Sequence, residues 1–218
     1  MSHSLDRGTF LNIHEESYYI VYPDYEFDEY KTDLIPTSYT ANTNWDFEKL
    51  NVESETLSFV SKNDNLNFLM EDYALAFSVP NFIVTSKLKE LIESGLYGSQ
   101  FVPAIIQDKQ NNSVKGLWAL NTFKTLNCID LNRSKFYMPG NGSTNIDGFT
   151  IHADMDNYRF REDVLDAIPE AERLIFQVAG TSLGEIFVHQ KVVDIFKEHN
   201  VKGINFFKVS EFVDGEQY

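Results

Sequence analysis

The chain has 218 residues, of which 43% are hydrophobic and 14% aromatic, so it can bury a sizeable core and is not an intrinsically disordered protein. No apolar run approaches the roughly 18–20 residues of a membrane span, and the N-terminus lacks the basic and apolar regions of a secretory signal. The single cysteine, Cys128, excludes an internal disulfide and fits a reducing compartment. We therefore expect a cytoplasmic protein that does not act on a membrane.

The acidic residues are concentrated in the first part of the chain. The formal net charge is −15; residues 1–80 contain 15 acids and 4 bases, and residues 81–218 contain 18 acids and 14 bases. Such a surface repels phosphate backbones, which argues against nucleic-acid binding. The charge serves either solubility alone or the steering of a basic partner. We expect an irregular, acidic, aromatic-rich N-terminal lobe over residues 1–80 and a second domain over residues 81–218, unless the two form one continuous domain.

The N-terminal part predicts two strands. "SYYIVYP" has the composition of a strand, and it ends at Pro23, which cannot donate a ladder hydrogen bond. "SETLSFVSK" spaces its apolar residues as a half-buried strand does. After the first strand, "DYEFDEY" (Asp24–Tyr30) alternates acids with aromatic residues. Trp45 and Phe47 are expected to anchor a polar segment against the body.

The stretch Val84–Phe101 predicts the end of a strand, a short helix, a glycine turn and another strand. Leu88, Leu91 and Ile92 lie at the spacing of one helix face. Thr85 or Ser86 is expected to accept the free N–H groups at the helix start, and Gly98 allows the backbone to turn back.

The stretch Val188–Phe206 repeats this unit. Val192, Ile195 and Phe196 keep the helical spacing, and Gly203 corresponds to Gly98 with one inserted residue at the helix exit. The match covers apolar positions and turn glycines, which is typical of duplicated packing. We therefore predict an α+β fold with a mixed or antiparallel sheet, short helices and two similar strand–helix–turn–strand units that form one rigid body.

Between the two units the pattern is rich in strands. We predict strands in "KGLWALN", in "FKTLNCIDL" and in "FTIHADMD", where Phe149, Ile151, Ala153 and Met155 share one side. "REDVLDAIPEAER" predicts a short helix interrupted by Pro169. "RLIFQVAG-TSLG-EIFVHQ" predicts a hairpin that leads into the second unit.

One row of polar residues has the composition of a metal site. His152, Asp154 and Asp156 alternate with apolar residues and so share a strand face, and imidazole with carboxylates suits several divalent ions. However, successive residues on one face stand about 7 Å apart, too far for three adjacent ligands on a flat strand. We expect a solvated face and no bound metal.

Asp130, Arg133 and Ser134 lie within five positions and permit two interpretations. An Asp–Arg pair beside a hydroxyl can position a substrate for a hydrolase or transferase, but the same residues form a common turn in which Asp130 accepts backbone N–H groups. No histidine stands nearby to activate Ser134, and Cys128 in its apolar run is expected to be buried and unreactive. We expect no catalytic residues and no cofactor.

Several of these segments resemble one family of bacterial proteins. The resemblance runs roughly from residue 81 to residue 208, through "NFIVTSKLKELIE", "FVPAII", "LWALNTFKTLNCIDLNRSKF" and "RLIFQVAG" to "IFVHQKVVDIFKEHNVKGINFF". It is to the immunity proteins of polymorphic toxin systems, the eleventh family in the immunity series, formerly a domain of unknown function. The chain departs from the family pattern at Gln177, where arginine is more usual, and at His189, which replaces a serine. The matching positions are Val84, Ser86, Leu88, Asp130, Ser134, Val201, Gly203 and Phe206.

The resemblance implies a binding protein and not an enzyme. An immunity protein binds a cognate bacterial toxin and neutralises it by covering its surface. A toxin with a basic surface would suit the acidic N-terminal part, because opposite charge raises the association rate. Tyrosines ringed by charge are typical of contact hot spots. We therefore expect the partner-binding residues to be Asp24, Tyr25, Glu26, Asp28, Glu29 and Tyr30.

A second function stays open on the sequence alone. The chain also suits a small-molecule or carbohydrate-binding module without catalysis, in which Trp45, Phe47 and Trp118 would stack on the ligand.

Overall fold

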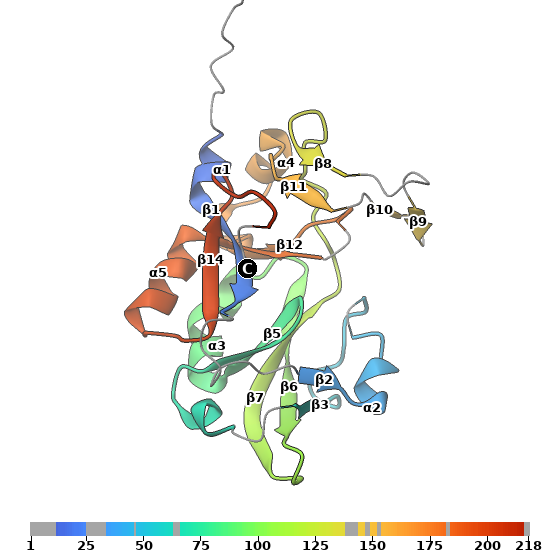
Figure 1. Ribbon diagram of the computed structural model, residues 1–218, viewed down its shortest axis with the longest axis vertical. Coiled ribbons are helices and arrows are strands. Elements are labelled where there is room, and N and C mark those ends of the chain that lie inside the picture. Colours follow the sequence, from blue (N-terminus) through green and yellow to red (C-terminus); the bar gives the residue numbers. More distant parts are fainter. Residues whose placement is uncertain are drawn as a thin grey trace, which may run out of the picture.

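The computed structural model describes residues 12–24, 34–45, 47–62, 66–137, 144–146, 149–151, 154–181 and 184–215. Over these residues the chain forms two main sheets, with helices α3 and α5 packed on them (Figure 1). Mixed and antiparallel strands with short helices confirm the predicted α+β class.

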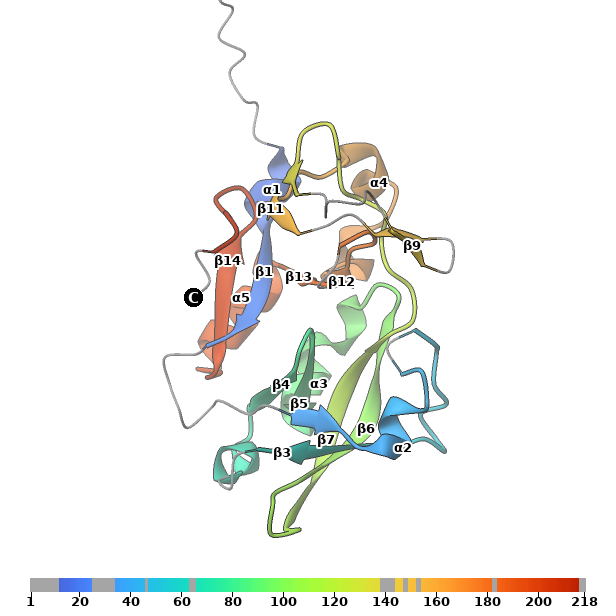
Figure 2. The same cartoon turned by 45° about the vertical axis from the view of Figure 1, so that its right-hand side comes forward.

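The larger sheet has six strands in the order β2-β3-β6-β7-β5-β4, and only β3 and β6 are parallel neighbours. Its two outer strands approach each other, and the Ser78 hydroxyl on β4 donates to the Leu34 carbonyl on β2 at 3.3 Å. The sheet therefore curls around its own core (Figure 2). Its strands are β2 (Leu34–Pro36), β3 (Leu57–Ser61), β4 (Leu75–Ser78), β5 (Asn81–Thr85), β6 (Ser99–Gln107) and β7 (Ser113–Thr122).

The smaller sheet joins the two ends of the chain. Its four strands run in the order β12-β13-β1-β14, and all neighbours are antiparallel. The predicted first strand and the predicted hairpin before the second unit are both present. The strands are β1 (Tyr18–Pro23), β12 (Ile175–Gln177), β13 (Ile186–His189) and β14 (Ile204–Lys208).

The two predicted units have the same arrangement, which confirms the repeat. The first consists of β5, α3 (Ser86–Ile92) and β6, and the second of β13, α5 (Gln190–Glu198) and β14. In each unit a third strand lies between the two others and is antiparallel to both: β7 in the first, β1 in the second. β4 and β12 flank β5 and β13 in the same way.

The turns of the two units also correspond. Gly98 and Gly203 both have positive φ, 61° and 77°, and Asn200 ends the second helix at φ 53°. Asn tolerates this left-handed conformation better than most residues. A Cβ atom on Gly98 would lie 2.0 Å from the carbonyl oxygen of Lys124, so only glycine fits there.

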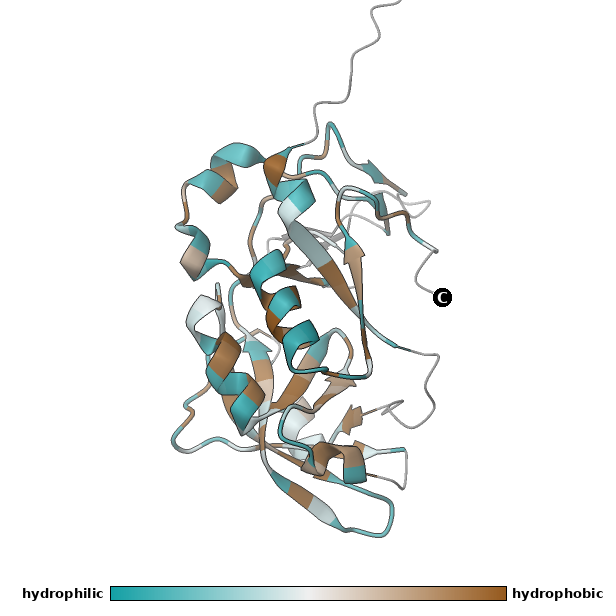
Figure 3. Ribbon diagram, turned by 90° about the vertical axis from the view of Figure 1, so that its left-hand side faces the viewer, coloured by the Kyte–Doolittle hydropathy of each residue, from teal (hydrophilic) through white to brown (hydrophobic). Residues whose placement is uncertain are grey.

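Both units pack into one shared core between the sheets. α3 and α5 lie side by side on the face of the molecule seen in Figure 3, with apolar residues directed inward. Leu88 and Val192, at equivalent helix positions, are completely buried. The buried members of this core are Val21, Leu75, Phe77, Phe82, Val84, Leu88, Ile92, Phe101, Leu120, Ile175, Ile186, Val188, Val192, Val193, Phe196 and Ile204.

Alternate strand residues point to the opposite faces, where two further cores form. The six-stranded sheet encloses one that includes Leu57, Phe59 and Trp45. The outer face of the four-stranded sheet carries the other, in which five large rings form what we term the aromatic cluster. Its members are Tyr18, Tyr158, Phe160, Phe176 and Phe187.

The remaining elements are short. None of the helices in the described part of the chain has the length and apolar character needed to span a membrane. They are α1 (Ile13–Ser17), α2 (Ser38–Ala41), α4 (Glu162–Asp166), the 3-10 helices η2 (Asn67–Met70), η3 (Glu93–Gly95) and η4 (Glu170–Glu172), and the strands β8 (Lys135–Phe136), β9 (Thr144–Ile146), β10 (Phe149–Ile151) and β11 (Met155–Asn157). Residue 80, near which a domain boundary was expected, lies in the turn between β4 and β5.

Two predicted strands are wrong. "FKTLNCIDL" makes only isolated bridges, at Leu126 and Ile129. Leu126 pairs with one segment, at Val178, and Ile129 with another, at Phe160, so neither pairing extends into a strand. "FTIHADMD" contains two separate strands, since β10 pairs with β9 and β11 pairs with β8.

Two local expectations are also corrected. Trp45 is buried as predicted, but Phe47 is 79% exposed and anchors nothing. Thr85 occupies the start of α3 without capping it, because its hydroxyl donates to the carbonyl of Asp72 at 2.7 Å.

Candidate partner-binding surface

The predicted partner-binding segment begins at the end of the four-stranded sheet. The Asp24 N–H donates to the Gly203 carbonyl at 3.0 Å and so extends the pairing of β1 with β14. Tyr25, Glu26, Asp28, Glu29 and Tyr30 lie outside the described residues. The chain is described again at β2, on the six-stranded sheet, so this segment joins the two sheets in sequence.

The Asp130–Ser134 segment forms the turn that the sequence favoured. The Asp130 carboxylate accepts the Asn132 N–H at 3.0 Å, and the Asp130 carbonyl accepts the N–H groups of Arg133 and Ser134. The Ser134 hydroxyl accepts the Arg159 N–H at 2.9 Å. All three residues therefore have structural partners, and the Arg133 guanidinium donates to the Phe160 carbonyl at 3.3 Å.

That guanidinium also contacts Glu15, for which the sequence alone predicts no role. Glu15 on α1 is completely buried, and its Oε1 accepts from Arg133 Nη2 at 3.1 Å and from the Phe160 N–H at 3.0 Å. Its Oε2 lies 3.7 Å from Arg159 Nε, beyond hydrogen-bond distance. Asn12 donates to the Phe160 carbonyl on the same segment at 3.2 Å. We term these contacts the Glu15 clamp, because they hold the N-terminal helix onto residues 133–160.

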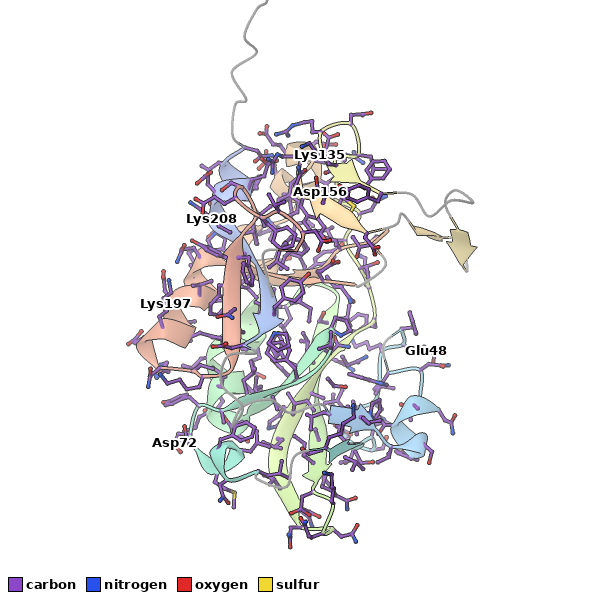
Figure 4. All side chains as sticks on the ribbon, in the orientation of Figure 1. Glu48, Asp72, Lys135, Asp156, Lys197 and Lys208 are labelled. Atoms are coloured by element: carbon purple, nitrogen blue, oxygen red, sulfur yellow. The ribbon has the colours of Figure 1, made fainter. Side chains whose placement is uncertain are left out.

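The described part of the proposed histidine–aspartate row shows no metal site. His152 lies outside the described residues, while Asp154 and Asp156 supply their carbonyls to the Tyr137 and Asp214 N–H groups. Figure 4 shows Asp156 on β11 beside Lys135 on the paired strand β8. Within the described ranges, no three His, Cys, Asp or Glu side chains gather closely enough to hold an ion.

Two further residues named from the sequence also serve the fold. Cys128 is completely buried, and burial raises the pKa of its thiol, which leaves it unreactive. His189 starts α5, where its Nδ1 accepts the Lys191 N–H at 3.2 Å. Burial lowers the pKa of His189, which favours the neutral ring that this bond requires.

The three aromatic residues proposed to stack on a ligand lie in different environments. Trp45 packs edge-on against Phe59 inside the six-stranded sheet. Trp118 packs against the shared core, donates to the Ser86 hydroxyl at 3.0 Å and lies under the Lys89 ammonium. Phe47 is exposed. No platform of stacked rings joins these three.

A buried carboxyl group faces the aromatic cluster. Glu185 is 6% exposed, and its Oε2 and the Tyr158 hydroxyl each lack a hydrogen-bond partner among the described residues. Burial raises the pKa of Glu185, and the nearby polar groups of Tyr158 and Thr181 offset only part of this shift. The negative charge of Asp214 acts in the same direction as burial.

Stability is therefore expected to depend on the ionisation of Glu185. The folded chain holds this proton more tightly than the unfolded chain, so the contribution is fully present below about pH 4.5 and is lost as the pH rises through the folded-state pKa. Glu185→Gln should raise the free energy of unfolding at neutral pH, relative to the unchanged chain. Urea denaturation between about pH 4 and 8 measures this. A constant difference between the two proteins across that range would contradict the assignment.

Residues 11–211 match the immunity protein family Imm11. The matched range includes both sheets, both repeat units and the Glu15 clamp. The chain belongs to this family. No curated protein matches it.

Proposed function

We propose that this chain neutralises a cognate bacterial toxin by binding and covering part of the toxin surface, without catalysis, in the cytoplasm. The observation that carries the proposal is the family match over residues 11–211. The toxin is expected to have a basic surface, since the immunity protein has a net charge of −15. The same charge argues that neither a nucleic acid nor an anionic membrane is the partner.

Co-expression tests this proposal directly. The toxin domain encoded beside the gene for this chain is expressed alone and together with the chain in the same cells. We expect growth arrest in the first case and growth in the second, with both proteins eluting as one complex. Continued arrest in the presence of folded chain, or the lack of a complex, would overturn the proposal.

We further propose that the Asp24–Tyr30 segment contacts the toxin. Replacing Asp24, Glu26, Asp28 and Glu29 with their amides should slow association at least about tenfold at low salt, because electrostatic steering acts mainly on the association rate. Stopped-flow measurement over a range of salt concentrations gives this rate.

A matched control separates local contact from total charge. The control variant changes four exposed glutamates outside the Asp24–Tyr30 segment to glutamine, namely Glu53, Glu90, Glu172 and Glu198. It removes the same number of negative charges. We expect this control to slow association much less. Equal rates for the two variants would remove the Asp24–Tyr30 segment from the binding surface.

A further inference from the structure

Strand β14 forms an open edge of the four-stranded sheet. In the described ranges its only partner strand is β1, and Figures 1 and 2 both show it at the outer boundary of the sheet. Within the described residues, the other edge strands of the two main sheets each have a neighbour. β2 and β4 approach each other, and β12 is bridged by Leu96 through a parallel contact with Ile175.

Two hydrogen bonds at the ends of the strand pair determine which backbone groups face outward. Asp24 N–H donates to the Gly203 carbonyl, and Val209 N–H donates to the Tyr18 carbonyl, both at 3.0 Å. Asp24 and Gly203 form one hydrogen-bonded pair of the antiparallel ladder, and Tyr18 and Val209 form another. Because hydrogen-bonded and non-hydrogen-bonded pairs alternate, every second pair between these two is also hydrogen-bonded. The backbone groups of Asn205 and Phe207 consequently point toward β1. Those of Ile204, Phe206 and Lys208 point away from the sheet.

Most of the outward groups have no hydrogen-bond partner among the residues that the structure describes. The Lys208 carbonyl accepts the N–H groups of Glu211 and Phe212 in the following turn. This leaves the N–H and carbonyl groups of Ile204 and Phe206 and the N–H of Lys208 as a regular row on the edge. Strand edges of natural proteins are commonly blocked by proline, bulges or a covering segment. β14 has no proline, and its register with β1 shifts nowhere over five residue pairs.

The charge around this edge favours a basic partner over a second copy of the chain. Asp24 stands at one end, and Glu211 and Asp214 follow the other. The Glu16 Oε2 atom lies 2.5 Å from Lys208 Nζ, so the carboxylate offsets the lysine charge. Lys208 is the labelled lysine beside β14 in Figure 4. Lys202 is a base that precedes the strand by two residues. A second copy would bring another net charge of −15 to the same place.

We infer that the toxin adds an extended strand of its own to the outer edge of β14. This inference rests on the proposed function and specifies how the toxin is held. Main-chain hydrogen bonds to Ile204, Phe206 and Lys208 fix the strand, and Asp24 supplies a negative charge at the end of the same edge. The contact needs no pocket, because the recognition groups are backbone atoms.

Residue-resolved amide hydrogen exchange tests the inference on the full chain. It is measured by NMR for the free protein and for its complex with a catalytically inactive variant of the toxin domain encoded beside its gene. We expect the amides of Ile204, Phe206 and Lys208 to exchange quickly in the free chain and at least about tenfold more slowly in the complex. The amides of Asn205 and Phe207 should be slow in both states.

A pair of variants at one position gives an independent readout. Lys208→Pro removes an outward N–H and leaves the bonds to β1 intact, whereas Lys208→Ala removes the same side chain and its contact with Glu16 but keeps that N–H. We expect the proline variant to bind the toxin about five- to tenfold more weakly than the alanine variant. Circular dichroism verifies that both are folded.

The possible outcomes separate the two proposals. A complex that forms without added protection at the three outward amides, or equal affinities for the folded proline and alanine variants, overturns the docking mode and leaves the proposed function standing. Absence of any complex overturns both. A free chain that is dimeric, with these amides already protected, shows that a second copy occupies the edge and also overturns the inference.

Discussion

Replacing Phe187 with alanine is expected to lower the free energy of unfolding by about 4 kcal/mol. The side chain is completely buried in the aromatic cluster. Its ring centroid lies 5.1 Å from that of Tyr158, 5.4 Å from that of Phe160 and 5.6 Å from that of Phe176. These neighbours come from two segments, residues 158–160 and strand β12, and both are held in the same buried core, so neither can collapse alone into the space left by the ring. Urea denaturation with a two-state fit measures the loss.

The control for this prediction is a second phenylalanine with the opposite environment. Phe47 is 79% exposed, so Phe47→Ala should change the stability by less than about 0.5 kcal/mol. Similar losses for the two variants would show that the aromatic cluster is not the tightly packed core described above.

Glu15→Gln is expected to lower the free energy of unfolding by about 3 kcal/mol. The substitution leaves the size of the side chain unchanged but removes the negative charge that faces two guanidinium groups, those of Arg133 and Arg159. The Glu15 carboxylate has no solvent exposure, and the Arg159 side chain is only 17% exposed, so water compensates little. The variant should also expose α1 to early proteolysis, since the clamp holds this helix.

Its neighbour in the sequence provides the matched control. Glu16 carries the same charge and contacts Lys208, but 38% of its side chain is exposed, and exposed ion pairs contribute about 1 kcal/mol or less. Glu16→Gln should therefore be nearly neutral. If the two variants had equal stability, the Glu15 clamp would not be a main support of the N-terminal helix.

Local patterns in the sequence predicted the repeat because both of its signals are local. The spacing of Leu88 and Ile92, and of Val192 and Phe196, marks the buried face of each helix, and the glycines mark the turns. The same spacing misleads at Leu91, which shares the stripe but is 38% exposed at its edge. Short-range periodicity thus identified the units but not the full extent of their burial.

Long-range pairing could not be predicted in this way. Nothing in "SYYIVYP" indicates that β1 inserts between β13 and β14, more than 160 residues later, because strand partners are chosen by the whole fold. The Glu15 clamp was missed for the same reason. Two adjacent glutamates near the N-terminus resemble solvated acids, and only the distant guanidinium groups make one of them a buried ion-pair partner.

The position of β1 between β13 and β14 has a consequence for biosynthesis. All strands of the six-stranded sheet lie between residues 34 and 122, so this sheet can form while the ribosome is still translating the rest. The four-stranded sheet forms only when β1 can pair with β13 and β14, which are translated more than 160 residues later. A nascent chain that has not yet been extended past β14 therefore lacks the completed second sheet, although its first sheet can already be folded.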